Sequence, residues 1–101
     1  MSDGSKAVAL LIGAVAGPEG ALRAPFRMLD AALLAHVAPD TVICALLAGD
    51  SDAMTVAERL AELGWRGRLV VVAQGLPNRR MVQQELQAIA PWISVEVVAG
   101  L

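Results

Sequence analysis

TVICALLAGDSDAMTVAERLAELGWRGRLVVVA, residues 41–73, holds two apolar runs with one helical pattern between them. The runs Thr41–Leu47 and Leu69–Ala73 are continuously apolar, as parallel strands are when both faces of their sheet are covered. From Ala53 to Leu63 the apolar residues recur at helical spacing, and Asp52 is a suitable N-cap. A strand, a helix and a second strand in this order predict a parallel βαβ unit with a right-handed crossover.

The same alternation extends in both directions along the chain. Toward the N-terminus, Ala7–Ile12 is another apolar run, and a helical pattern follows it from Ala24 to Val37. Toward the C-terminus, a helix expected from Arg79 to Ala90 precedes the run Ile93–Val98. This last run alternates between apolar and polar residues, which favours a strand at the edge of the sheet.

These elements predict a single α/β domain over residues 7–101, after a flexible polar tail of residues 1–6. The expected fold is a trimmed flavodoxin-like domain with a four-stranded parallel sheet and three crossover helices. By analogy with doubly wound sheets, the first choice of strand order is 2-1-3-4, and 1-2-3-4 is the alternative. In either order three helices cover the two faces incompletely, so we expect exposed apolar strand surface in the middle of the sheet.

The composition argues against several classes of protein. Apolar residues make up 56% of the chain, which favours an ordered domain. No apolar run reaches the roughly 18 residues that span a bilayer. The net charge of −2 and the aromatic content of 3% give no nucleic-acid footprint. One cysteine and one histidine without ligand-like spacing predict neither a metal site nor a cofactor, and an unpaired cysteine fits a cytoplasmic location.

Ligand sites in parallel sheets lie beyond the carboxyl ends of the strands, and this rule selects three loops. The first, GAVAGPEG from Gly13 to Gly20, has neither the dinucleotide-binding nor the P-loop spacing, so we favour a flexible connection over a phosphate cradle. The second contains Asp50 and Asp52, two carboxylates that suit Mg²⁺. A capping role for Asp52 is the favoured interpretation.

The third loop ends in Asn78, the expected cap of the last helix, which is followed by Arg79 and Arg80. Both cations stand where the helix dipole is already positive, so an anion or an acidic partner at this point would stabilise them. Two solvated arginines remain the favoured interpretation.

No set of catalytic residues is predicted. Cys44 lies within an apolar strand and is expected to be buried and inert, and His36 has no partner of catalytic type nearby in the pattern. Trp65 and Trp92 each precede a strand, which places them at the edge opposite the three loops. They either close the bottom of the core or form a partner surface.

From Pro39 onward the chain resembles a response-regulator receiver domain. PDTVICALLAGDSDAM, residues 39–54, is similar to the receiver pattern of Pro-Asp, an apolar strand, an acceptor aspartate and an acidic turn. AERLAELGWRGRLVVVAQ, residues 57–74, resembles the third helix and fourth strand of that family. The resemblance implies a flavodoxin-like fold and a role in signalling.

The departures from the receiver pattern concern its chemistry. Ala45 stands at the phosphoacceptor position, Ala73 replaces the Thr or Ser after the next strand, and Ala99-Gly100 replaces the Lys-Pro pair. The acidic pair expected after Ile12 is absent. The resemblance therefore implies a degenerate receiver that cannot be phosphorylated on aspartate, shortened so that only one helix fits between its first two apolar runs.

Two functions follow as expectations. The first is a non-catalytic protein-interaction domain in signalling or regulation, with a protein partner or a second copy docked on the uncovered sheet. The alternative is a domain, or an enzyme fragment, that binds a small molecule or anion in a pocket lined by Gly13, Asp50, Asn78 and Arg79. Neither expectation involves nucleic acid or a membrane.

Overall fold

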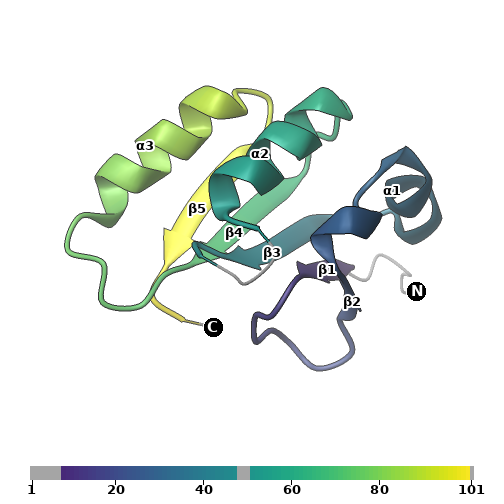
Figure 1. Cartoon of the computed structure of the whole chain (residues 1–101), viewed down its shortest axis with the longest axis horizontal. Helices are drawn as coiled ribbons and strands as arrows, with labels where there is room; N and C mark the ends of the chain where they lie inside the picture. Colours follow the sequence, from purple (N-terminus) through teal and green to yellow (C-terminus); the bar gives the residue numbers. More distant parts are fainter. Residues whose placement is uncertain (1–7, 48–50, 101) are drawn as a thin grey trace, which may run out of the picture.

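The computed structural model describes residues 8–47 and 51–100; the expected tail, residues 1–6, lies outside this part. Within it the chain forms one parallel sheet of five strands with three α-helices and a short 3₁₀ turn (Figure 1). In chain order the elements are β1 (Ala9–Ile12), β2 (Leu22–Ala24), η1 (Phe26–Met28), α1 (Ala31–Val37), β3 (Thr41–Ala45), α2 (Ala53–Glu62), β4 (Arg68–Val72), α3 (Arg79–Ile89) and β5 (Ser94–Val98). The expected α/β class and the parallel sheet are confirmed.

The strand order is β2-β1-β3-β4-β5, and every neighbouring pair is parallel. The expected count of four strands is therefore wrong, and so is the first-choice order. The four expected strands lie side by side in chain order, as in the alternative, and β2 adds a fifth outside β1. The edge position expected for the last strand is confirmed, since β5 pairs only with β4 in this sheet.

The segment before α1 explains the missed strand. The expected helix from Ala24 begins only at Ala31, because Ala24 ends β2 and Pro25 is extended, with φ −73° and ψ 158°. A residue that precedes proline is pushed toward extended conformations. The helix starts where Asp30 supplies a cap, its carboxylate accepting a hydrogen bond of 2.8 Å from the Leu33 N–H.

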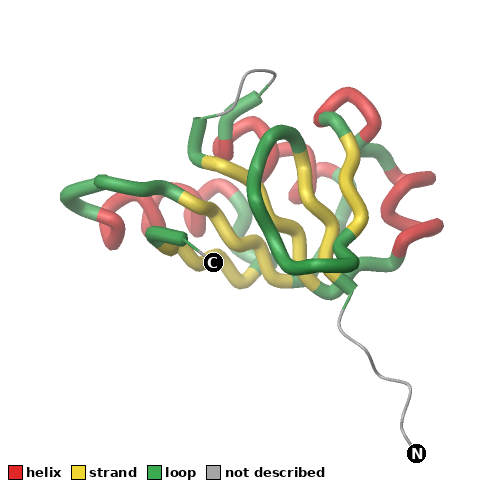
Figure 2. The backbone as a smooth tube through the Cα atoms, turned by 90° about the horizontal axis from the view of Figure 1, so that it is seen from below, coloured by secondary structure: helices red, strands yellow, loops and turns green. Residues whose placement is uncertain are grey.

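The handedness of the crossovers places all three helices on one face. The steps from β2 to β3, from β3 to β4 and from β4 to β5 run in one direction across the sheet, whereas the step from β1 to β2 runs the other way. Right-handed connections then put residues 13–21 on the face opposite the helices. In Figure 1 these residues lie below the sheet and the helices above it, and in Figure 2 the same connection crosses in front of the strands.

Alternate strand residues form two apolar clusters. The larger lies between the sheet and the helices, where Leu60 of α2 and Leu86 of α3 are fully buried. The smaller lies on the helix-free face and consists of Leu11, Val15, Ile43 and Val70. In this cluster Ile43 is 4% and Val70 3% exposed, so the exposed apolar surface expected in the middle of the sheet is not found.

Two glutamines of α3 close the outer edge of the sheet. The backbone N–H of Val95 donates to Oε1 of Gln87 at 3.1 Å, and that of Val97 donates to Oε1 of Gln83 at 3.0 Å. Unpaired backbone groups on an edge strand invite pairing with another chain. The side chains of α3 satisfy these two donors, so β5 is a poor template for strand addition.

Candidate functional site

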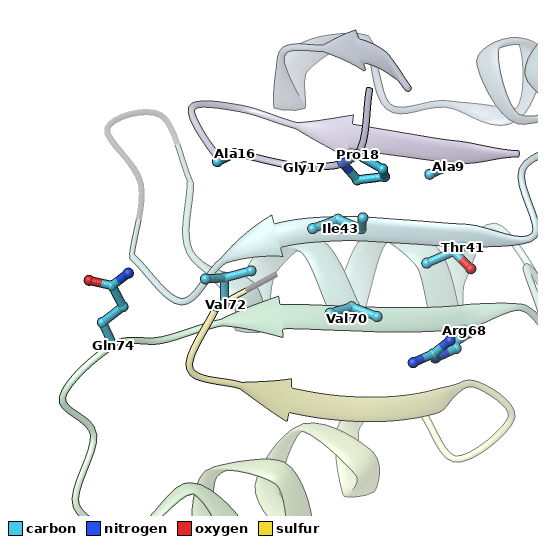
Figure 3. A pocket seen from close by; sticks show the side chains of 11 residues that line it. Ala9, Ala16, Gly17, Pro18, Thr41, Ile43, Arg68, Val70, Val72 and Gln74 are labelled. Carbon is cyan, nitrogen blue, oxygen red and sulfur yellow. The ribbon is translucent and has the colours of Figure 1, made fainter. Parts of the chain in front are cut away.

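The helix-free face carries an open groove of about 750 Å³ (Figure 3). It lies between residues 16–18 of the β1–β2 connection and the strands β3 and β4. Its lining consists of Ala9, Ala16, Gly17, Pro18, Thr41, Ile43, Arg68, Val70, Val72, Gln74 and Gly100. The groove is mostly apolar, and polar side chains stand at its two ends.

Arg23 of β2 holds the connection over the sheet. Its guanidinium donates to the carbonyl oxygen of Gly13 and, at 2.8 Å, to that of Val15. Gly13 also donates its N–H to the Ala24 carbonyl at 3.0 Å and has a φ of +78°, a conformation that favours glycine. These contacts turn the chain back across the sheet directly after β1, so the wall of the groove is fixed.

Gly17 permits the close approach of this wall to the sheet. A Cβ atom at this position would stand 2.4 Å from Cδ2 of Leu11. Any side chain at residue 17 therefore displaces either Leu11 or the connection, and the width of the groove depends on glycine here.

One end of the groove is charged and the other is neutral. Thr41 and Arg68 stand at the amino ends of β3 and β4, and Gln74 lies beyond the carboxyl end of β4 (Figure 3). The Arg68 guanidinium is paired with the carboxylate of Glu96 on β5, and about half of each side chain is exposed. A pair this exposed contributes little to stability.

The groove is not the pocket that was expected at the carboxyl edge of the sheet. Neither Gly13 nor Asn78 nor Arg79 lines the groove, and Asp50 lies outside the described residues. The prediction of a pocket lined by these residues is therefore not met by this groove. The reason is that the loop after β1 folds back over the face of the sheet instead of standing at its carboxyl edge.

Asp52 has a structural role at the start of α2. Its carboxylate accepts hydrogen bonds of 2.8 Å from both the backbone N–H and the hydroxyl of Thr55. These bonds from Thr55, the backbone one first, lower the pKa of Asp52. In the part of the chain that the structure describes, no group of three or more His, Cys, Asp or Glu side chains is placed to hold a metal ion.

The N-terminus of α3 is capped as expected. Oδ1 of Asn78 accepts a hydrogen bond of 3.1 Å from the Met81 N–H, and the side chains of Arg79 and Arg80 are exposed. The structure adds no further group that points to an anion here, so the anion site remains a prediction.

Cys44 lies in β3 on the helix-covered face and is buried. Burial, followed by the negative charge of Asp52, raises the pKa of its thiol to about 12. A thiol of this kind is protonated at neutral pH and is a poor nucleophile. His36 lies in the last turn of α1 and is not one of the residues that line the groove.

The two tryptophans have different environments. Trp65 is half-buried against the helix-side core, and its indole N–H donates to the Pro39 carbonyl at 3.3 Å. Trp92 is 69% exposed, and the guanidinium carbon of Arg66 lies 5.4 Å from the centre of its ring. Trp65 thus closes the bottom of the core, and Trp92 is left as the candidate for a partner surface.

The sequence pattern did not single out Arg23, Thr41, Arg68 or Gln74. One signal was present, because Arg68 at the start of β4 and Glu96 within β5 are opposite charges on the last two strands. Their pairing on the same face follows from the register, in which Arg68 faces Ser94 and Val70 faces Glu96. The other three become recognisable only when the connection is folded over the sheet.

Comparison of the chain with protein-family models, with curated proteins and with solved structures finds no match. None of the described helices is long and apolar enough to cross a membrane.

Proposed function

We propose that this chain is a non-catalytic protein-interaction domain of receiver-like topology that cannot be phosphorylated on aspartate. The strand order β2-β1-β3-β4-β5 supports it, since 2-1-3-4-5 is the order of flavodoxin-like sheets. The helix-free face, where residues 13–21 replace a crossover helix, marks the difference from a complete doubly wound fold.

The positions compared with the receiver pattern lie at or just beyond the carboxyl ends of three neighbouring strands. Ala45 is the last residue of β3, and Ala73 follows β4 on the neighbouring strand. Ala99 and Gly100 follow β5. An alanine side chain has no oxygen to accept a phosphoryl group, so signalling by this domain has to proceed through binding.

The observation that carries the proposal is the exposed ring of Trp92 beneath Arg66. Tryptophan and arginine are the residue types most enriched among those that dominate binding energy in protein interfaces. A guanidinium over an indole face is also attractive, which orders both side chains before a partner arrives. The Trp92 surface, formed by Trp92 and Arg66, is therefore the proposed docking point.

Incubation with acetyl phosphate and Mg²⁺ is expected to leave the mass of the intact protein unchanged, because alanine occupies the acceptor position. Intact-mass spectrometry measures this directly, with a phosphorylatable receiver domain as the positive control. A stable gain of one phosphoryl group on an aspartate contradicts the proposal.

A photo-crosslinking amino acid at position 92 is expected to give a discrete adduct with one protein in cells of the source organism. The same probe at Met81, an exposed residue on α3 near the opposite edge of the sheet, serves as the matched control. We expect Arg66→Ala to weaken the adduct formed at position 92, because the guanidinium that belongs to the same docking point is then missing. An adduct of twice the chain mass identifies the partner as a second copy. Equal adducts at positions 92 and 81, or none at position 92, contradict the docking point.

A further inference from the structure

We propose that the groove on the helix-free face binds a small, elongated, mostly apolar molecule with an anionic end, of the kind represented by a medium-chain carboxylate. This ligand site is separate from the Trp92 surface and goes beyond the proposed protein interaction. The size of the groove, its lining and the position of its single charge each support it.

The size fits a small molecule. Ligand pockets typically measure about 300–1,000 Å³, and the groove holds about 750 Å³. Its lining extends from Arg68 at the start of β4 to Gln74 just beyond the end of that strand, a length of roughly 20 Å at the usual rise per strand residue. The occupant that matches this shape is long and thin.

A second copy fits this face less well. A stable pair of proteins buries about 800 Å² on each partner. The uncovered strands β3 to β5 present an area of only about 10 by 16 Å at the usual strand spacing and rise. Ile43 and Val70, at the centre of this face, are 4% and 3% exposed and have little surface left to bury. The usable space lies instead between the strands and residues 16–18, where a narrow molecule can lie.

The charge defines one end of the ligand. Arg68 is the single charged residue among the groove's described lining residues, and no acidic side chain lines it. The Glu96 carboxylate is paired with one guanidinium nitrogen of Arg68. Because a guanidinium has five N–H donors in all, this pairing does not use every donor. The hydroxyl of Thr41 stands at the same end (Figure 3). A carboxylate bound there would complete the hydrogen bonding of Arg68, while its chain extends between residues 16–18 and β4 toward Val72.

The test uses decanoate below its micellar concentration as the probe, with decanol and acetate as the tail-only and head-only comparisons. Calorimetry measures affinity, and amide chemical shifts locate the site. We expect decanoate to bind the full chain more tightly than either comparison, with shifts concentrated at Gly17, Val70 and Val72. Saturable binding without shifts at these residues contradicts the site, and so does the absence of decanoate binding to the folded protein.

Three variants separate the contributions of charge and space. Arg68→Gln is expected to lower the affinity for decanoate about tenfold, because a charge-assisted hydrogen bond is lost. The affinity for decanol is expected to stay unchanged. Glu96→Gln removes the carboxylate that pairs with the Arg68 guanidinium, and it is expected to raise the affinity for decanoate. Val72→Phe fills the groove and is expected to abolish binding of both molecules, whereas Val98→Phe, on the next strand and outside the lining, is the matched control.

If Arg68→Gln and the native chain bind decanoate with equal affinity, the proposal that Arg68 binds the anionic end of the ligand is wrong. Undiminished binding by Val72→Phe overturns the groove as the site. If Val72→Phe does not fold, Ala9→Leu fills the same groove from β1 and takes its place.

Discussion

Alkylation of Cys44 is expected to run about a thousandfold slower in the folded protein than in the unfolded chain near pH 8. The thiol pKa rises from 9.0 to about 12 on folding, chiefly because the thiolate would be buried, so far less thiolate is present. Iodoacetamide labelling followed by mass spectrometry measures the rate with and without denaturant. Equal rates in both conditions would show that β3 is not covered by α2.

The same shift makes the domain sensitive to alkaline pH. Because the folded pKa lies above the unfolded one, the contribution of the protonated thiol is complete below pH 9.0 and is lost as the pH rises toward about 12. The slope is on the order of 1.4 kcal/mol per pH unit for one group. The chain has no tyrosine, which removes one other source of alkaline titration.

Urea unfolding at several pH values tests this slope, and Cys44→Ala is the control. We expect the free energy of unfolding of the variant to stay nearly constant between these pH limits while that of the native chain falls. A parallel fall in both proteins assigns the alkaline sensitivity to another group.

The part of the fold that local pattern predicted is the part with long apolar runs and strong caps. The elements β3, α2 and β4 form the expected βαβ unit, and α2 and α3 end within one residue of their expected bounds. Asp52 and Asn78 both accept a hydrogen bond from the residue three positions on, as their type and position indicated. Caps and continuous apolar runs are local features, so the sequence alone carries them.

The part that pattern missed depends on contacts between distant segments. β2 has only three residues, too few for a periodic signal, and it is stabilised by its pairing with β1 and by the bonds from Arg23 to residues 13 and 15. Once β2 takes the outer edge, its crossover determines which face stays without helices. An apolar run shows that a strand is buried, but it does not show which strand lies beside it.

The groove could not be predicted from the sequence for the same reason. Its lining comes from β1, the β1–β2 connection, β3, β4 and the segments after β4 and β5. No two of these segments share a sequence motif, and the glycines of the connection matched no known phosphate loop. The loop that the sequence analysis assigned to a flexible connection became the wall of the groove, because Arg23 and Gly17 hold it close to the sheet.

The second large effect is expected from Leu86→Ala. Leu86 is the single residue of α3 that is fully buried, with Val82 and Ile89 only partly so. Truncation of a buried leucine removes its apolar surface from the core and leaves a cavity, at a cost of about 2–5 kcal/mol. A domain of this size has a total stability of about 5–15 kcal/mol, so a large share of it is lost.

Met81→Ala on the same helix is the matched control, because Met81 is 56% exposed and its truncation is expected to cost no more than about 0.5 kcal/mol. Urea unfolding at neutral pH measures both variants, and a lower midpoint with an unchanged slope is the expected result for Leu86→Ala.

The effect extends to the edge of the sheet, since Gln83 and Gln87 accept hydrogen bonds from the N–H groups of β5 only while α3 is docked. Loosening α3 therefore exposes an unpaired strand edge, and we expect Leu86→Ala to aggregate during unfolding where Met81→Ala does not. Equal unfolding midpoints for the two variants would show that Leu86 does not anchor α3 to the sheet.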